Sequence, residues 1–494
     1  MKYSFTYSIL LLGLLMMGCS SDDAMMVDDE EEVVYTNGSA DFSTFVALGN
    51  SLTAGYSDGA LSLQGQEASL PYILSEQFSL VGGGEFTQPL VSDNLGGMTL
   101  GGQQILDNRL ILSFASGSPA PVNVSGMPST EVSSVLSGGF NNMGVPGAKI
   151  FHLGVEGYGN VGGLLNGTAN PYFVRFASSA NASIMADAMA QSPTFFSLWI
   201  GNNDILSYAI AGGAGENQAG NLDPTTYGSN DITDPNVFAA VYNGLLQILT
   251  SGGAKGVVAN IPDITTIPYF TTVPYNPVPL DATTAGMLNA AFANYNAGLQ
   301  QMQSYGFITM DEMNARTIVY SEGASNAMLI EDEDLTDLTA YGIPNYRLTT
   351  ANDLIVLTAQ NIIGTTVNED PTLINGVSVP LSDQWVLTPQ EQQMVATAQT
   401  SFNATIDALA TNYGLAMVDV EGVMDMLANG GITVNGSTLT STYATGGAFS
   451  LDGVHPSSRG YAYLANEFIA AINATYGSDL PGVNPIDYTA LYLE

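Results

Sequence analysis

Four short apolar runs constrain the fold of this chain more than any other feature. They cover residues 44–48, 195–200, 256–261 and 415–420, and each ends in or next to Gly, Asn or Asp. Runs this short and this apolar predict strands that are buried on both faces. Segments with helical spacing lie between or after them, so we expect an α/β fold with a mostly parallel sheet covered by helices on both sides.

Two helices stand out near the C-terminus. Residues 388–391 read Thr-Pro-Gln-Glu, a capping box with proline at the first helical position, and this predicts a helix that ends near residue 412. Farther on, Leu464, Phe468 and Ile472 are four residues apart and predict the last helix.

Long connections separate these elements. We expect one domain over residues 41–480, with insertions at about 57–140, 205–250 and 262–387, followed by a tail at 481–494. A compact domain rarely contains structureless loops of this length, so the insertions are expected to hold small subdomains or a lid.

The N-terminus has the pattern of an export signal. Lys2 precedes an apolar run over residues 9–17, which predicts a signal peptide over residues 1–18 and is too short to span a bilayer comfortably. The run ends at Cys19, the only cysteine of the chain. Leu15-Met16-Met17-Gly18-Cys19 resembles a bacterial lipobox, in which the cysteine is acylated; the alternative is an ordinary signal peptide with an incidental cysteine.

An acidic segment follows the cysteine. Residues 19–40 are expected to form a flexible acidic tether, and they resemble the surface-export signal of Bacteroidetes lipoproteins. The alternative is a solvated linker without a signalling role. Together these segments predict an exported protein that is held in the outer membrane by a lipid anchor, with exposure at the cell surface as a further possibility.

Charge and composition exclude several functions. The chain has 8 Lys and Arg against 46 Asp and Glu, a net charge of −38, which excludes nucleic acid as a partner. Its only histidines are His152 and His455, so a zinc site of the usual His/Cys kind lacks ligands. We expect no metal or organic cofactor, and any catalytic imidazole must belong to one of these two residues.

Ser51 lies in a suggestive turn. An apolar run leads into Gly49-Asn50-Ser51, and Gly55 follows a few residues later. In an open α/β sheet, ligands bind at the carboxyl ends of the strands, which is where this serine is expected. The simpler alternative is a serine that only caps a helix.

Asp452 and His455 are spaced for a second role. An aspartate three residues before a histidine can place its carboxylate against the far nitrogen of the imidazole, which fixes the tautomer and stabilises the imidazolium. The alternative is an Asp-Gly turn with a surface histidine. His152 has no such partner in the sequence.

Two further segments offer donors for an oxyanion. One is Ile200-Gly201-Asn202-Asn203-Asp204, with a side-chain amide, and the other is Asn142-Met143-Gly144-Val145-Pro146-Gly147-Ala148, with glycine N–H groups in a sharp turn. Either segment alone would be a commonplace loop.

Together, these segments resemble the SGNH (GDSL-type) hydrolase family. The four matching blocks are, in order, Gly49-Asn50-Ser51-Leu52, Asn142 to Gly147, Gly201-Asn202-Asn203-Asp204 and Asp452-Gly453-Val454-His455-Pro456. The resemblance implies a flavodoxin-like three-layer α/β/α fold. It also implies that Ser51 attacks an ester carbonyl, that His455 relays the proton and that Asp452 orients His455.

The resemblance also implies an oxyanion hole made by the backbone N–H groups of Ser51 and Gly147 and the side chain of Asn203. One departure is Asn50, where many members have Asp. We expect this residue to adjust the reactivity of the site rather than to abolish activity. Asp204 is expected to hold the turn around Asn203.

Three residues are considered as substrate contacts. His152 follows the second block, although a hydrogen-bonded structural histidine is the more frequent outcome. Tyr269 and Phe270 belong to an aromatic loop over residues 267–275, which could line an acyl pocket or pack only on its own subdomain.

The resulting hypothesis is an esterase or lipase that works through an acyl-enzyme. Two substrates compete: a lipid or other fatty-acyl ester, and an acetyl group on a glycan, which would make the protein a carbohydrate O-acetyl esterase. Transfer of the acyl group to a sugar remains open, and so does a non-catalytic surface binding lipoprotein on the same fold. The sequence does not indicate an oligomeric state.

Overall fold

Five parallel strands form the central sheet in the order β17-β8-β7-β1-β6. They are β1 (Phe45–Gly49), β6 (Asn142–Gly144), β7 (Phe195–Trp199), β8 (Lys255–Ala259) and β17 (Ala416–Val418). The structure is a computed structural model that describes residues 34–115 and 117–494. The predicted signal peptide and Cys19 lie outside the described residues, as does most of the acidic tether.

Four of these strands are the four predicted ones, and β6 is new. It is only three residues long, it lies at the edge of the sheet, and it pairs with β1 so that Asn142 is opposite Ala47. Its sequence, Asn-Met-Gly, has no β-branched or aromatic residue, so nothing in it predicts a strand. The strand places the second sequence block beside the first.

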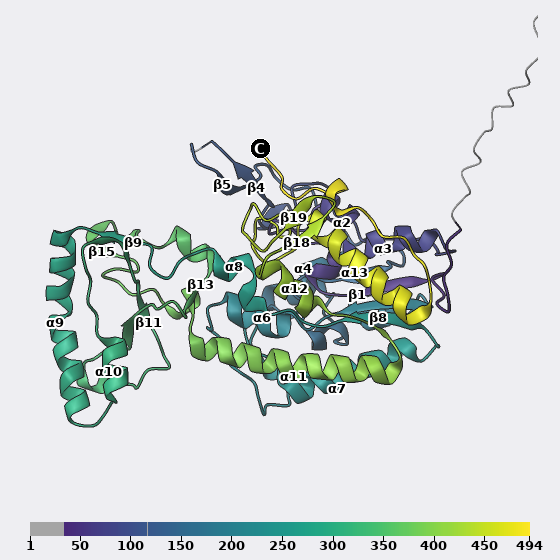
Figure 1. Cartoon of the computed structure of the whole chain (residues 1–494). Coiled ribbons are helices and arrows are strands. Elements are labelled where there is room, and N and C mark those ends of the chain that lie inside the picture. The colour runs from purple at the N-terminus through teal and green to yellow at the C-terminus, as the bar shows by residue number, and fades with distance from the viewer. Residues whose placement is uncertain (1–33, 116) are drawn as a thin grey trace, which may run out of the picture. The chain divides into compact units, whose positions relative to one another are not determined.

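Helices cover both faces of the sheet. Helix α13 (Ser458–Tyr476) packs against α3 (Leu70–Ser79), and α11 (Pro389–Tyr413) packs against α7 (Pro235–Thr250). Both α11 and α13 contact β8 and β17, and they lie on opposite sides of the strands (Figure 1). This α/β architecture is compatible with three α/β/α layers.

The predicted capping box at the start of α11 is confirmed. Thr388 accepts a hydrogen bond from the Glu391 N–H, and the Glu391 carboxylate accepts one from the Thr388 N–H at 2.6 Å. The helix ends at Tyr413, where Gly414 adopts a left-handed conformation with φ of +64°. Its buried face includes Phe402, whose ring stacks on Phe238 of α7 with centroids 4.0 Å apart.

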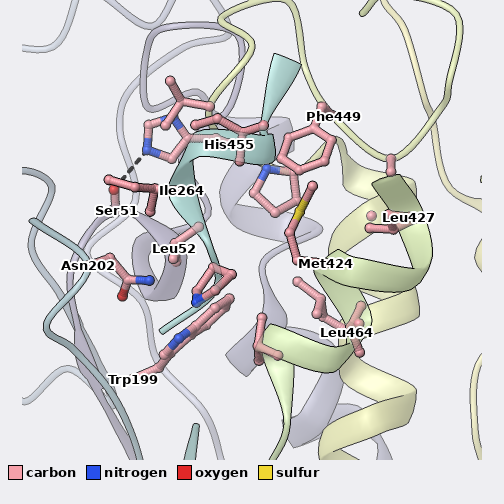
Figure 2. A pocket seen from close by; sticks show the side chains of 18 of the residues that line it. Ser51, Leu52, Trp199, Asn202, Ile264, Met424, Leu427, Phe449, His455 and Leu464 are labelled. Atoms are coloured by element: carbon pink, nitrogen blue, oxygen red, sulfur yellow. Dashed lines mark hydrogen bonds between the residues drawn. The ribbon is translucent and has the colours of Figure 1, made fainter. Parts of the chain in front are cut away.

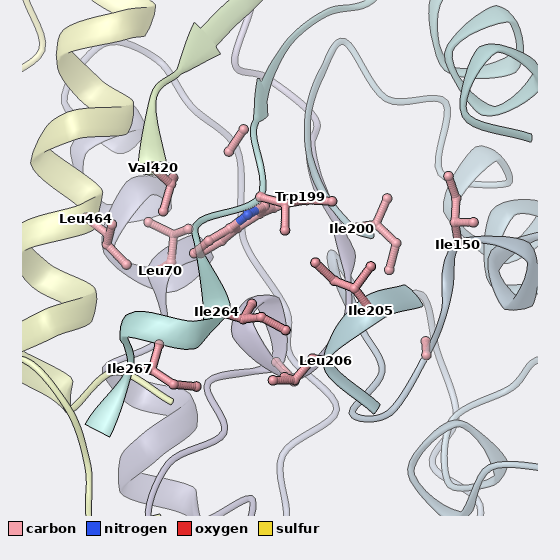
Figure 3. Packing of buried hydrophobic residues seen from close by; sticks show 14 of the residues in the cluster. Leu70, Ile150, Trp199, Ile200, Ile205, Leu206, Ile264, Ile267, Val420 and Leu464 are labelled. Atoms are coloured by element: carbon pink, nitrogen blue, oxygen red, sulfur yellow. The ribbon is translucent and has the colours of Figure 1, made fainter. Parts of the chain in front are cut away.

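The main core lies between the sheet and these helices. Figure 3 shows Trp199, at the end of β7, among buried side chains that include Ile264 and Ile267 from the segment after β8 and Leu464 from α13. Burying one large apolar side chain contributes about 1.5–3 kcal/mol, so this region holds the strand ends firmly.

The three expected insertions differ in kind. Residues 57–140 contain α2 (Leu63–Glu67), α3 and two hairpins, β2 (Met98–Leu100) with β3 (Gln103–Leu106) and β4 (Leu110–Ser113) with β5 (Ala120–Asn123). Residues 205–250 are not only an insertion, because they include α7, the crossover helix between β7 and β8.

Residues 262–387 hold several elements of their own and also contribute buried residues to the main core. This insertion contains α8 (Pro268–Thr271), α9 (Ala282–Ser304), α10 (Met310–Arg316) and short strands in two-stranded sheets: β9 (Val278–Leu280), β10 (Gly323–Asn326), β11 (Leu329–Glu331), β12 (Tyr346–Leu348), β13 (Leu354–Ile355), β14 (Thr366–Val367), β15 (Asp370–Ile374) and β16 (Val386–Leu387). A second, small core of Leu299, Met302, Ile308, Leu338 and Ile343 lies within it.

The C-terminal residues belong to the same compact unit, which spans Tyr35–Glu494. We expected a tail at 481–494. Instead, Leu112 of β4 donates its N–H to the Tyr492 carbonyl at 3.0 Å and accepts from the Glu494 N–H at 3.2 Å. In the part of the chain that the structure describes, no helix has the length and hydropathy needed to cross a membrane.

Candidate active site

Ser51 is the first residue of the short helix α1 (Ser51–Ala54), directly after β1. The Asn50 side chain caps this helix by accepting from the Leu52 N–H at 3.0 Å. The turn needs glycine at position 49, because a Cβ there would lie 2.2 Å from Thr53 Oγ1 and 2.4 Å from the Trp199 carbonyl oxygen. The sequence therefore brings Ser51 to the carboxyl edge of the sheet, as expected.

A chain of two hydrogen bonds joins Ser51, His455 and Asp452. Ser51 Oγ lies 2.8 Å from His455 Nε2, and His455 Nδ1 lies 2.9 Å from Asp452 Oδ2 (Figure 2 shows the first contact). An ionised carboxylate can only accept, so Nδ1 carries the proton and Nε2 is free to accept from the serine hydroxyl. The structure thus unites three residues that are up to 404 positions apart.

Backbone donors hold the Asp452 carboxylate. Oδ1 accepts from the N–H groups of Val454 and His455, both at 2.8 Å, and Oδ2 accepts from the Gly59 N–H at 2.9 Å. Burial alone would raise the pKa of this carboxyl, but the charge and hydrogen bonds of His455 and the backbone donors lower its pKa to about 2. Asp452 is therefore ionised at neutral pH.

Asp58 supports this loop, although the sequence did not predict a role for it. Its side chain accepts from the Leu451 N–H at 2.9 Å, and its own N–H donates to Ser450 Oγ at 2.9 Å. The residue is buried and has a φ of +55°, which is uncommon for a residue other than glycine. Burial, and then the charge of Asp452, raises the pKa of Asp58 to about 6. The Ser57-Asp58-Gly59 turn signature was the only signal in the sequence.

The candidate oxyanion donors face one cleft. Ser51, Gly147 and Asn203 all line it, and among the described residues the backbone N–H groups of Ser51 and Gly147 have no acceptor. Asn203 opens α6 (Asn203–Ile210) and donates one amide hydrogen to the Ala148 carbonyl at 2.9 Å, which fixes its side chain and leaves the second hydrogen for a ligand. These are the donors that an oxyanion in the cleft requires.

Within this segment, the packing favours Gly147 rather than Gly144 as the donor. The Gly144 N–H already donates to Asn142 Oδ1 at 3.0 Å, and a Cβ at Gly144 would lie 2.4 Å from the Ala54 backbone nitrogen. Gly144 thus lets β6 approach α1 closely. Gly147 has a φ of +82° and a free N–H at the cleft.

Asp204 holds the start of α6. The carboxylate is fully buried and accepts from the Ile150 N–H at 2.9 Å and from Thr233 Oγ1 at 2.7 Å. Burial raises the pKa of this group to about 6, although these hydrogen bonds oppose the rise. Asp204 ties Asn203 to the segment that follows Gly147, which is the structural place expected for it.

Two cavities meet at the serine. The wider one is a cleft of about 690 Å³, and the narrower one is an apolar slot of about 80 Å³. The residues that line both are Ser51, Asn203, Leu206, Val454 and His455. The rest of the slot is mostly apolar; Figure 2 shows Leu52, Trp199, Ile264, Met424, Leu427, Phe449 and Leu464 around it.

Of the three considered substrate contacts, only Tyr269 lines a cavity, the cleft. Phe270 is 2% exposed and packs in the main core instead. His152 lines neither cavity; its ring stacks on Tyr158 with centroids 4.4 Å apart, and its Nδ1 accepts from the Lys149 N–H at 3.0 Å. The structure therefore does not bring His152 or Phe270 to the site.

The part of the chain that the structure describes holds one group of three potential metal ligands, Glu333, Asp383 and Glu391, and none of them lines either cavity.

Comparisons with known proteins add no relative, because no family model, curated protein or solved structure matches this chain. The chemistry of the site itself therefore carries the functional argument.

Proposed function

We propose that the protein is a serine hydrolase that cleaves carboxylic esters through an acyl-enzyme on Ser51. The observation that carries this proposal is the relay from Ser51 Oγ through His455 to Asp452, with contacts of 2.8 Å and 2.9 Å, at the point where two cavities meet. The resemblance of the four sequence blocks to SGNH hydrolases supports the same reaction and supports that family's three-layer fold.

In the first half of the reaction, Ser51 Oγ attacks the ester carbonyl carbon and His455 Nε2 takes the hydroxyl proton. The negative charge on the tetrahedral oxygen accepts hydrogen bonds from the N–H groups of Ser51 and Gly147 and from the Asn203 amide. Asp452, ionised and held by three backbone donors, stabilises the imidazolium.

The bond between the carbonyl carbon and the alkoxy oxygen then breaks, and His455 gives its proton to the departing alcohol, which leaves the acyl-enzyme on Ser51. In the second half, water attacks the acyl-Ser51 carbonyl and loses a proton to His455. The intermediate collapses to a free carboxylic acid, and the Ser51 hydroxyl regains its proton. These steps balance without a metal or an organic cofactor.

The two cavities favour a fatty-acyl ester as the substrate. An apolar slot that opens at the serine suits an alkyl chain, because it removes apolar surface from water. The wider cleft has amide side chains from Asn123, Gln360 and Asn361 and suits a polar alcohol. That same cleft supports a second candidate, an acetyl ester of a glycan, which would leave the slot unused.

A chain-length series separates the two substrates. We expect p-nitrophenyl octanoate to be cleaved with a higher kcat/KM than p-nitrophenyl acetate, and acetylated xylan to be a poor substrate. The reverse order would favour the glycan O-acetyl esterase.

Ser51→Ala tests the reaction itself, with Ser207→Ala as the matched control, because Ser207 lines the same cleft outside the relay. We expect Ser51→Ala to lose about 10⁴-fold or more in kcat, and Ser207→Ala to keep most activity. Full activity in Ser51→Ala would contradict Ser51 as the nucleophile, whereas a wild type that cleaves no ester would favour a binding protein.

We also propose that a lipid on Cys19 anchors the enzyme in the outer membrane, on the strength of the lipobox resemblance. Metabolic labelling with a palmitate analogue should mark the full-length protein in a bacterial host. Labelling that persists in Cys19→Ser would contradict the anchor.

A further inference from the structure

Three carboxylates from distant segments converge outside the active site. Glu333 lies in the turn after β11, Asp383 opens the short helix η7 (Asp383–Trp385), and Glu391 is the third residue of α11. One oxygen from each lies within 4.8 Å of the other two. Glu333 is exposed and Glu391 is buried, so the group runs from the surface inward.

One carboxylate oxygen of Glu391 has no hydrogen-bond partner among the described residues. The side chain is 1% exposed; Oε2 accepts from the Thr388 N–H at 2.6 Å, but Oε1 is buried without a hydrogen-bond partner. A buried acceptor with no partner is uncommon and destabilising. The capping box therefore accounts for only one of the two oxygens of Glu391.

No basic side chain neutralises the group. Among the described residues, no Lys or Arg forms an ion pair with Glu333, Asp383 or Glu391. Arg347, which belongs to the same insertion, is paired with Asp332 and Asp353 instead. Like charges at such short range repel one another, so the group favours binding a cation or a proton.

We propose that Glu333, Asp383 and Glu391 bind a calcium ion that fastens the 262–387 insertion to the start of α11. The ligand atoms are all oxygens, which hard cations prefer. The three oxygens lie within 4.8 Å of one another, a spacing that Ca²⁺–oxygen bonds of about 2.3–2.6 Å can span. Ca²⁺ accepts several carboxylate ligands in a flexible geometry, whereas Mg²⁺ demands a near-octahedral one and usually keeps several waters. Exposed Glu333 gives the ion access from solvent, and water completes its coordination.

The ion would also support α6, which carries Asn203. Gly212 and Gly213 follow this helix and pack directly on the ligand residues. A Cβ at Gly213 would lie 2.0 Å from Glu391 Oε1, and one at Gly212 would lie 2.3 Å from the Asp383 carbonyl oxygen. Only glycine fits at these two positions, so the end of α6 rests against the proposed site.

Thermal unfolding of the full chain tests the proposal. We expect the Tm of the wild type to rise by about 3 °C or more between a chelator and about 1 mM CaCl₂. The double variant Glu333→Gln/Asp383→Asn keeps the capping box but loses two ligands, so its Tm should not respond to calcium. In the chelator, its Tm should be no lower than that of the wild type, because the repulsion is reduced. Glu322→Gln, an exposed carboxylate elsewhere on the insertion, should respond like the wild type.

Terbium luminescence gives a second readout that does not depend on activity. Trp385 follows Asp383 by two residues and should sensitise bound Tb³⁺, and Ca²⁺ should quench the emission by displacement. The absence of both the Tm rise and the emission would overturn the calcium site. The carboxyls would then be neutralised by a proton that they share. An equal Tm rise in the double variant would place the ion elsewhere, and an equal rise with MgCl₂ would contradict the calcium assignment.

Discussion

The two histidines of the described chain lie in regions that treat the imidazole in opposite ways. His455 lies in the loop before α13, where its Nδ1 faces the Asp452 carboxylate and its Nε2 faces Ser51. His152 lies in the short helix η1 (Ile150–Leu153), where its Nδ1 accepts from a backbone N–H and its ring stacks on Tyr158.

The partner of Nδ1 decides what each ring can do. A carboxylate accepts the Nδ1 proton and stabilises a positive ring, so His455 can take a proton from Ser51. A backbone N–H donates to Nδ1 and favours the neutral ring. Burial, and then the nearby charge of Lys149, lowers the pKa of His152 to about 4. Identical side chains thus become a proton acceptor in one region and a neutral packing element in the other.

Alanine substitution of each histidine should give the largest contrast. His455→Ala removes the proposed general base, and we expect a loss of about 10⁴-fold or more in kcat/KM with the fold retained. His152→Ala should keep activity within about threefold, because the ring lines neither cavity. Circular dichroism provides the folding control. Comparable losses in both variants would contradict the different roles given to the two histidines.

Asp452→Asn should be the next most severe change. An amide at this position can donate to Nδ1, which would hold the imidazole in the wrong tautomer for accepting the serine proton. We expect kcat to fall by about 10³- to 10⁴-fold while KM changes little. A loss below about tenfold would show that His455 does not depend on its carboxylate partner.

Asp58 is expected to have a smaller effect, because it holds the loop that carries Asp452 and does not touch the substrate. Asp58→Ala leaves the buried Leu451 N–H without its acceptor, so we expect a cost of about 1–3 kcal/mol in stability and a fall of about tenfold in kcat. Asp58→Asn keeps an acceptor and tolerates the positive φ, so it should restore both. Equal defects in the two variants would point to the charge of Asp58 instead.

The last expected effect concerns the pH dependence of stability near His152, and it leaves activity unchanged. Its pKa of about 4 lies below the ordinary value of about 6.5, so the unfolded chain binds more protons between these values. The contribution of the neutral ring is therefore present above pH 6.5 and is lost as the pH falls toward 4. When the pH falls from about 7.5 to 5, the free energy of unfolding measured in urea should decrease by roughly 2 kcal/mol less in His152→Phe than in the wild type. An unchanged pH dependence would contradict the environment described for His152.

Much of the fold could be predicted from local patterns. The four apolar runs became strands, and the Thr388–Glu391 capping box set the start of α11, because burial and capping are properties of short segments. Strand β6 could not be predicted, since its three residues join the sheet only through pairing with β1. Helix α7 was assigned to an insertion because nothing local shows that a helix is a crossover.

The site divides in the same way. Ser51, Asp452, His455 and Asn203 lie in recognisable turns, and the structure brings all four to one cleft. Asp58 and the Glu333, Asp383 and Glu391 cluster were not predicted, because their meaning depends on contacts between distant segments. Phe270 was considered as a substrate contact, but it is buried in the core, because the sequence does not show which side of an aromatic loop faces a pocket.

Covalent labelling tests the central claim, the activation of Ser51 by His455, most directly. A fluorophosphonate probe reacts with an activated serine hydroxyl, and mass spectrometry identifies the modified residue. We expect one adduct, on Ser51, in the wild type and in His152→Ala, and almost none in His455→Ala. An adduct on another residue, or undiminished labelling of Ser51 in His455→Ala, would contradict it.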